Sequence, residues 1–312
     1  MAWTLGHVAV SASFDPTART EGKLDYLTEA ERLRAHDRDG LYRGFAIAIA
    51  PDAPEVYAEL CPALRALGFT QLRGIITGVE LTDADCAEAS QAALTRCLQI
   101  ALEQDMDQVF CVAQEWPAGQ RDADFEADVL PAFVANVVPV LQATPALREF
   151  GIEPLIPAEQ QHVNTLAKAR RLADACNAEL GTRRVYPVPD LAHLYGLVPR
   201  EQWPAITAEL IEAIDGGEVL YGHLSIPETR SDQIVEALAA GELPEEAVRA
   251  LRRVACVDTE AFDPQDRFLD ALRERVPRFA AADPSGWTED RRFDRFMQAA
   301  AFFTQLGASA SA

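Results

Sequence analysis

The chain has 312 residues, and 49% of them are hydrophobic, which is ample for one or two folded domains and far above the range of disordered chains. It carries 49 Asp and Glu against 28 Lys and Arg, a formal net charge of −21 at pH 7. Proteins that bind nucleic acids or anionic membranes need positive charge to neutralise phosphates. This charge balance therefore argues against both kinds of partner.

The N-terminal stretch MAWTLGHVAVSASF has no positively charged leader ahead of its apolar residues, and no apolar run approaches the ~18 residues of a membrane span. The six cysteines are scattered, with no CxxC pair and no histidine at zinc-site spacing. We therefore expect buried, reduced thiols and a cytoplasmic protein.

Short apolar runs of strand type alternate with longer stretches that have apolar residues at helical spacing. The strand candidates are residues 7–14, 44–50, 72–79, 108–114, 149–156, 184–191, 218–226 and 253–262. The clearest helix candidates between them are residues 54–68, 86–104 and 163–181. Near-continuous apolar strands separated by amphipathic helices are typical of a parallel sheet covered on both faces. Eight such units predict an α/β protein with a closed (β/α)₈ TIM barrel. The absence of GxGxxG after the first strand argues against a dinucleotide-binding sheet.

The residues after the eighth strand predict a C-terminal helical extension. Helical patterns occupy 263–277 and 287–307, and the chain ends in GASASA. We therefore expect a barrel at 1–262 and an extension at 263–312 that packs on it. The apolar face of residues 293–303 could be covered by the barrel or by a second subunit, which leaves a homo-oligomer open.

Polar residues stand near the carboxyl ends of the last four predicted strands, where the loops of a TIM barrel meet. They are Glu153, Asp190, His223 and Glu260, separated by 37, 33 and 37 residues. Generic βα units would show the same spacing, and a single acid there is more often a helix cap or an ion-pair partner. A buried carboxylate without a partner costs several kcal/mol, however. Four such residues in register favour a shared cation.

The chemistry of this set points to the kind of ion. Three carboxylates and one neutral imidazole suit Mn²⁺, Mg²⁺ or Co²⁺, and they suit Zn²⁺ less well. His193 follows Asp190 by three residues. It could contact the substrate, support a metal ligand or bind metal itself.

Four stretches carry a family resemblance: GIEPLI with Glu153, PDLAHLYGL with Asp190, YGHLSIPETR with His223, and VACVDTEAF with Glu260. On these motifs, residues 148–262 resemble the xylose-isomerase-like TIM barrel superfamily, in particular its sugar phosphate isomerase/epimerase branch. The resemblance implies one divalent metal held by those four residues, with the two glutamates also acting as the acid/base pair. It further implies a small carbohydrate substrate contacted by His193 and Arg230, with Glu228 as an additional candidate. In a sugar site, Trp116 in AQEWPAG could stack on the ring.

The activity implied is isomerisation or epimerisation of a sugar by proton abstraction next to a carbonyl, through an enediolate. The same site could instead run a dehydratase or lyase reaction on a keto-inositol or keto-glycoside. A non-catalytic barrel that serves as a partner or sugar-binding subunit is the third option. Xylose isomerases proper have a lysine shortly after the first glutamate, where this chain has Leu155 and Ile156. The endonuclease IV type needs several histidines in its first half, where this chain has His7 and His36.

Overall fold

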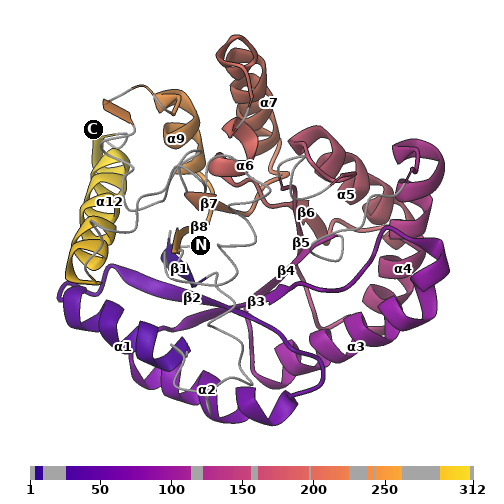
Figure 1. The fold of residues 1–312 in the computed structure, drawn as a ribbon, viewed down its shortest axis with the longest axis horizontal. Helices are drawn as coiled ribbons and strands as arrows, with labels where there is room; N and C mark the ends of the chain where they lie inside the picture. Colours follow the sequence, from indigo (N-terminus) through magenta and orange to yellow (C-terminus); the bar gives the residue numbers. More distant parts are fainter. Residues whose placement is uncertain are drawn as a thin grey trace.

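A computed structural model describes residues 4–9, 26–113, 122–155, 161–196, 198–224, 238–239, 241, 243–261 and 289–309. Strands occupy the centre of the molecule and helices surround them (Figure 1). The strands are β1 (Thr4–Ala9), β2 (Tyr42–Ala48), β3 (Gln71–Ile76), β4 (Gln108–Val112), β5 (Phe150–Glu153), β6 (Val185–Pro187), β7 (Tyr221–Leu224) and β8 (Cys256–Ala261). Each lies within or beside one of the eight runs predicted from the sequence, and β1 begins three residues earlier than expected.

The strands form one parallel sheet in the order β6-β5-β4-β3-β2-β1-β8-β7. The two outer strands of that order meet just beyond the end of β6. There Asp190 forms a parallel bridge with His223, and the backbone N–H of His223 donates to the carbonyl of Pro189 at 2.8 Å. This bridge closes the sheet, so the structure is the predicted (β/α)₈ barrel.

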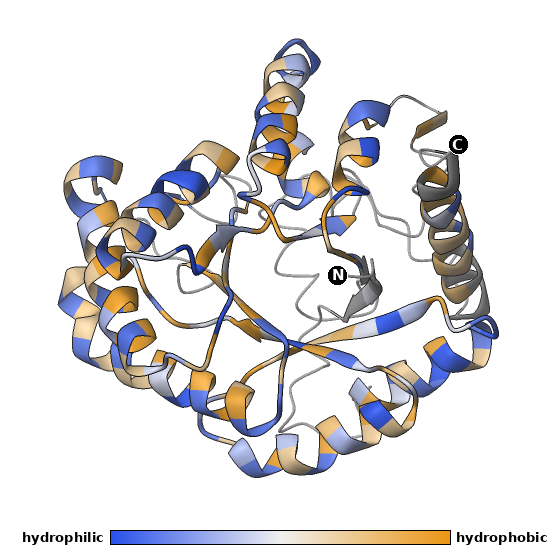
Figure 2. Ribbon diagram, turned by 180° about the vertical axis from the view of Figure 1, so that it is seen from behind, coloured by the Kyte–Doolittle hydropathy of each residue, from blue (hydrophilic) through white to orange (hydrophobic). Residues whose placement is uncertain are grey.

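The helices within the described residues form the outer layer (Figure 1). They are α1 (Tyr26–His36), α2 (Pro54–Ala66), the 3₁₀ turn η3 (Ala84–Cys86), α3 (Ala87–Glu103), the π-helical turn η4 (Phe125–Val129), α4 (Leu130–Ala143), α5 (Leu166–Leu180), α6 (Leu191–Tyr195), the 3₁₀ turn η5 (Arg200–Gln202), α7 (Trp203–Asp215), α9 (Glu245–Leu251) and α12 (Glu289–Ser309). On longer helices such as α2, α3 and α5, apolar and polar residues alternate around the axis (Figure 2). Each of these three helices buries its apolar residues against the rest of the barrel and leaves polar ones in water.

The apolar core has two layers, because side chains alternate between the two faces of every strand. In β3, for example, Leu72 and Ile76 belong to the large cluster shared with the helices, whereas Ile75 belongs to a small separate cluster. The small cluster is drawn from strands around the barrel and fills its interior; its members are Ala46, Ile75, Phe110, Val188, Tyr221 and Cys256. Residues that share this inward face are the ones that can build a site at the barrel mouth.

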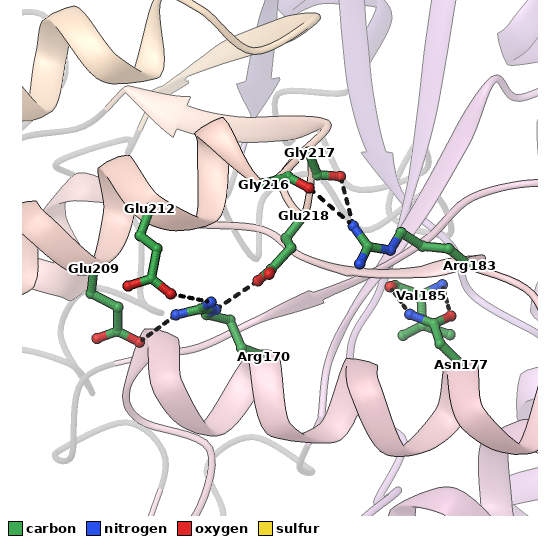
Figure 3. Close-up of polar contacts among 9 residues, drawn as sticks. All are labelled: Arg170, Asn177, Arg183, Val185, Glu209, Glu212, Gly216, Gly217 and Glu218. Atoms are coloured by element: carbon green, nitrogen blue, oxygen red, sulfur yellow. Dashed lines mark hydrogen bonds and ion pairs between the residues drawn. The ribbon is translucent and has the colours of Figure 1, made fainter.

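Polar contacts from α5 hold the short strand β6 in place. The side-chain oxygen of Asn177 accepts a hydrogen bond from the backbone N–H of Arg184 at 2.8 Å. The same oxygen accepts from the N–H of Val185 at 2.9 Å, and the amide donates to the carbonyl of Val185 at 2.8 Å (Figure 3). Nearby, Arg170 of α5 donates to Glu218 at 2.7 Å, ahead of β7 (Figure 3). The contacts of Asn177 fix the start of β6, and the chain reaches Asp190 just beyond the other end of that strand.

The C-terminal helix α12 lies beside α1 (Figure 1). The ring of Phe293 stacks on His36 with centroids 5.0 Å apart, and the backbone carbonyl of Phe296 accepts from the hydroxyl of Tyr42 at 3.2 Å. The residues between β8 and α12 lie outside the described part of the chain. The division into a barrel at 1–262 and an extension at 263–312 therefore stays a prediction.

One described helical stretch, Phe125–Ala143, is long and apolar enough by composition to cross a membrane. It contains α4, which packs between α3 and α5 in the outer layer and buries Phe133, Val137 and Leu141. This packing is that of a core helix in a barrel.

Candidate metal centre at the carboxyl ends of the strands

Glu153 and His223 meet across the barrel mouth. Glu153 is the last residue of β5, His223 is the third residue of β7, and both side chains are buried. The Oε1 atom of Glu153 lies 2.8 Å from Nδ1 of His223. The strand ends thus bring together two residues that are 70 positions apart in the sequence.

Asp190 and His193, which follow the end of β6, complete the cluster. Asp190 caps the short helix α6, with Oδ1 accepting from the backbone N–H of Ala192 at 2.6 Å. Its other oxygen, Oδ2, lies 3.0 Å from Nε2 of His193, which in turn is 3.9 Å from Oε1 of Glu153. Ligand atoms of Glu153, Asp190 and His193 all lie within 4.8 Å of one another. The cap and the cluster therefore use different oxygens of one carboxylate.

The donor set fits a divalent cation. Two carboxylates and two imidazoles are buried at one point, with Asp190 and His223 fully shielded from solvent (0% exposed) and Glu153 4% exposed. Burial of ionised carboxylates at such a point is stable when a cation or proton is shared among them. The 2.8 Å between Nδ1 of His223 and Oε1 of Glu153 is short enough for the two atoms to share one cation or proton.

A second polar layer lies beneath this cluster, two residues earlier on the strands. The hydroxyl of Tyr221 lies 2.7 Å from Nε2 of His223 and donates to Oδ2 of Asp258 at 2.8 Å. The guanidinium of Arg73 in β3 donates to Oδ1 of Asp258 at 2.7 Å and also contacts the sulfur of Cys256. All of these side chains are buried inside the barrel.

The surroundings of this lower layer shift the pKa values of Arg73 and Tyr221. Burial alone would lower the pKa of Arg73, but the charge of Asp258 and the neighbouring Cys256 and Tyr221 raise it above the ordinary value. Burial, followed by the charge of Asp258, raises the pKa of Tyr221 well above its ordinary value. Near pH 7 the layer therefore holds a charged guanidinium and a neutral phenol.

Comparisons with known proteins bear on this barrel. No family model matches the chain, and no curated protein matches it. D-Psicose 3-epimerase from Clostridium cellulolyticum H10, solved with D-tagatose, is 16% identical with a TM-score of 0.64, covering 97% of this chain and 99% of that one. D-Allulose 3-epimerase from Methylomonas sp. in complex with D-allulose is 11% identical with a TM-score of 0.66, covering 97% of each chain. A xylose isomerase domain protein from Alicyclobacillus acidocaldarius subsp. acidocaldarius is 14% identical with a TM-score of 0.56, covering 96% of this chain and 100% of that one.

The chain has the barrel fold of these three proteins. This confirms, at the level of the fold, the resemblance found in the sequence motifs. At these identities the likeness is one of architecture, and the activity has to be argued from the site.

Four of the residues predicted for the site are brought together in this barrel, namely Glu153, Asp190, His193 and His223. Glu260 lies in β8, where its backbone pairs with Val8 of β1; its side chain lies outside the described part. The remaining candidates also lie outside the described residues: Trp116, Glu228 and Arg230. All eight assignments of role stay predictions.

Sequence reasoning missed the lower layer of the barrel. Three signals were present. Tyr221 and Asp258 stand two positions before His223 and Glu260, which is the spacing of residues on the same face of a strand. The third was Arg73, a charged residue inside the apolar run QLRGII. None of these signals reveals which strand carries the partner, so the pairing became visible only in the folded barrel.

Proposed function

We propose that the chain is a divalent-metal-dependent sugar isomerase or epimerase that removes a proton next to a carbonyl. The observation that carries this proposal is the convergence of Glu153, Asp190, His193 and His223 at the mouth of a barrel that has the fold of sugar 3-epimerases. Active sites of TIM barrels lie at this face. Two of the similar epimerases were solved with the ketohexoses D-tagatose and D-allulose, which makes ketoses the first substrates to test here.

In the proposed reaction the two glutamates exchange protons with the substrate. A divalent cation, when bound, supplies Lewis-acid stabilisation of negative charge at the carbonyl oxygen. Glu153 would then act as the base, since its carboxylate is buried and shielded from competing water. Glu260, on β8, would return a proton to the opposite face, and His193 would donate a hydrogen bond to a substrate hydroxyl.

The ligand roles follow the donor chemistry of the chain. Asp190, His223, Glu153 and Glu260 would hold the ion, and Mn²⁺, Mg²⁺ or Co²⁺ suits their oxygen-rich set. His193 stands close enough to Asp190 to orient its carboxylate. Among the residues outside the described part, Arg230, Glu228 and Trp116 are proposed to contact the sugar.

A deuterium-exchange assay tests this function. The protein is stripped with EDTA, reloaded with Mn²⁺, Co²⁺ or Mg²⁺, and incubated in D₂O with D-fructose, D-allulose and D-tagatose. We expect metal-dependent deuterium incorporation at the carbon next to the carbonyl, read by NMR, with an epimer or an aldose as the product. Loss of water from a keto-inositol would instead identify a dehydratase. Absence of exchange with every metal and ketose, together with sugar binding, would leave a non-catalytic barrel.

A further inference from the structure

We infer that Arg73, Asp258 and Tyr221 form a positioning relay that keeps the proton of His223 on Nε2 and presents Nδ1 to the metal. The inference rests on the metal centre of the proposed function and adds the residues that orient one of its ligands. Arg73 comes from β3, Asp258 from β8 and Tyr221 from β7, so the relay crosses the barrel interior.

The direction of each hydrogen bond follows from the number of protons available. Asp258 is paired with the Arg73 guanidinium at 2.7 Å, and a carboxylate in such a pair only accepts hydrogen bonds. The single hydroxyl proton of Tyr221 is therefore donated to Asp258 at 2.8 Å. The phenolic oxygen, 2.7 Å from Nε2 of His223, is left to accept, so Nε2 must carry hydrogen.

With hydrogen on Nε2, a neutral His223 has its lone pair on Nδ1. That atom lies 2.8 Å from Oε1 of Glu153, which is also an acceptor. Two acceptors at this distance repel each other unless a positive charge lies between them, either a proton on Nδ1 or a metal ion. The relay thus creates, at Nδ1, a demand for positive charge that a divalent ion satisfies.

Packing holds the ring of His223 in the matching orientation. Phe110 of β4 meets it edge to face, with centroids 5.1 Å apart and an interplanar angle of 69°. The same phenylalanine contacts the Tyr221 ring at 5.4 Å, and the Arg73 guanidinium lies 5.0 Å from the centre of that ring. Orientation of the imidazole thus comes from packing, and its tautomer comes from the relay.

Two glycines make room for the charged end of the relay. A Cβ atom on Gly6 of β1 would overlap the carboxylate of Asp258, and one on Gly44 of β2 would lie 2.5 Å from Nη1 of Arg73. A buried ion pair contributes little net stability compared with apolar residues of the same volume. Gly6 and Gly44 nevertheless leave room for this pair. We attribute that room to the effect of the pair on the protonation of His223.

Two spectroscopic measurements test the assignment directly. The protein, labelled with ¹⁵N-histidine, is loaded with ¹¹³Cd²⁺, and its five histidines are observed by ¹⁵N NMR, with His223→Gln identifying the signal of interest. We expect cadmium coupling at Nδ1 of His223 and a proton on Nε2. Manganese affinity is measured separately by electron paramagnetic resonance.

The variant Tyr221→Phe keeps the ring and removes the hydroxyl, which accepts from Nε2 of His223 and donates to Asp258. We expect it to weaken Mn²⁺ binding about 10–100-fold, the usual effect of losing a hydrogen-bond partner of a metal-bound histidine. The matched control is Tyr186→Phe, whose hydroxyl contacts the carbonyl of Arg183 away from the cluster. A second variant, Arg73→Met with Asp258→Leu, removes the buried pair as a unit so that the fold is retained, and frees the Tyr221 hydroxyl to donate to Nε2. It should also weaken binding and move the His223 proton to Nδ1 in the metal-free protein.

The outcomes separate the relay from the proposed function. Cadmium coupling at Nε2, or wild-type Mn²⁺ affinity in folded Tyr221→Phe, overturns the relay while leaving the metal centre intact. If the wild type binds neither ion, the metal-dependent function fails. The relay is then judged by the metal-free spectrum, which supports it only if the Nε2 proton is present in the wild type and lost in the double variant.

Discussion

At the scale of single residues, Glu153 is the proposed base that lies within the described cluster. Replacing it by Gln keeps its shape and removes its charge, so Glu153→Gln should lower kcat by at least 10²–10⁴-fold, the usual contribution of a general base. Deuterium exchange into the ketose measures this loss. Glu212→Gln on the exposed face of α7 is the matched control and should exchange at the wild-type rate. Wild-type exchange in folded Glu153→Gln would exclude this residue as the base.

Asp190 combines a structural and a chemical role in one carboxylate, and the two can be separated. Asp190→Asn retains an oxygen for the N–H of Ala192 and removes a negative charge close to Glu153. We expect its metal-free form to be at least as stable to urea as the wild type, with Mn²⁺ affinity more than tenfold lower. Asp190→Ala should lose the affinity and also about 1 kcal/mol of the free energy of unfolding, because the helix cap is gone. Equal unfolding of the Asn and Ala variants would contradict the capping role.

At the scale of elements, the link between α5 and β6 depends on one amide side chain. Asn177→Ala leaves the backbone N–H groups of Arg184 and Val185, at the start of β6, without this acceptor, and we expect a loss of about 1–2 kcal/mol in the free energy of unfolding. The comparison is Arg171→Ala on the same helix, which breaks a half-exposed ion pair with Glu126 and should change stability by no more than about 0.5 kcal/mol. Chemical denaturation of both variants measures the difference, and similar losses would contradict the assignment.

Gly44 of β2 packs directly against the buried ion pair of Arg73 and Asp258. Gly44→Ala places a methyl group against the guanidinium of Arg73, which Asp258 holds in place, so overpacking should cost about 1–3 kcal/mol. The same change should be nearly neutral in the Arg73→Met, Asp258→Leu background, where the guanidinium is gone. Equilibrium unfolding of the four proteins gives the coupling energy. A cost that persists in the second background would assign the clash to other atoms.

The sequence predicted the features whose pattern lies within a few neighbouring residues, and it did not predict pairings between distant strands. The strands could be predicted because a buried parallel strand is a short apolar run. Glu153 and His223 could be predicted as site residues because each stands near the carboxyl end of such a run. The partner of Arg73 was not readable, because Asp258 lies 185 positions away and the pairing depends on barrel closure. His193 was expected near the site, but its approach to Asp190 depends on the single turn of α6, which carries no strong helical pattern.

At the scale of the whole molecule, the candidate metal centre lies beside the seam that closes the barrel. β6 and β7 meet through the bridge between Asp190 and His223, and Glu153 belongs to the neighbouring strand β5. An ion shared by these residues would tie three strand ends together at the place where the sheet is joined by a single bridge. Metal binding should therefore stabilise the entire barrel rather than one loop.

Thermal unfolding tests this coupling. At a Mn²⁺ concentration 100 times the Kd, mass action adds about 2.7 kcal/mol to the free energy of unfolding, which corresponds to a rise in Tm of roughly 5 °C for a chain of this size. The net charge of −21 provides many weak surface sites for divalent ions, so a rise in the wild type alone is not decisive. Asp190→Asn changes that surface little but removes a ligand, so its Tm should rise much less at the same Mn²⁺ concentration and ionic strength. An equal rise in both proteins would show that the stabilising ions bind the acidic surface and not the barrel mouth.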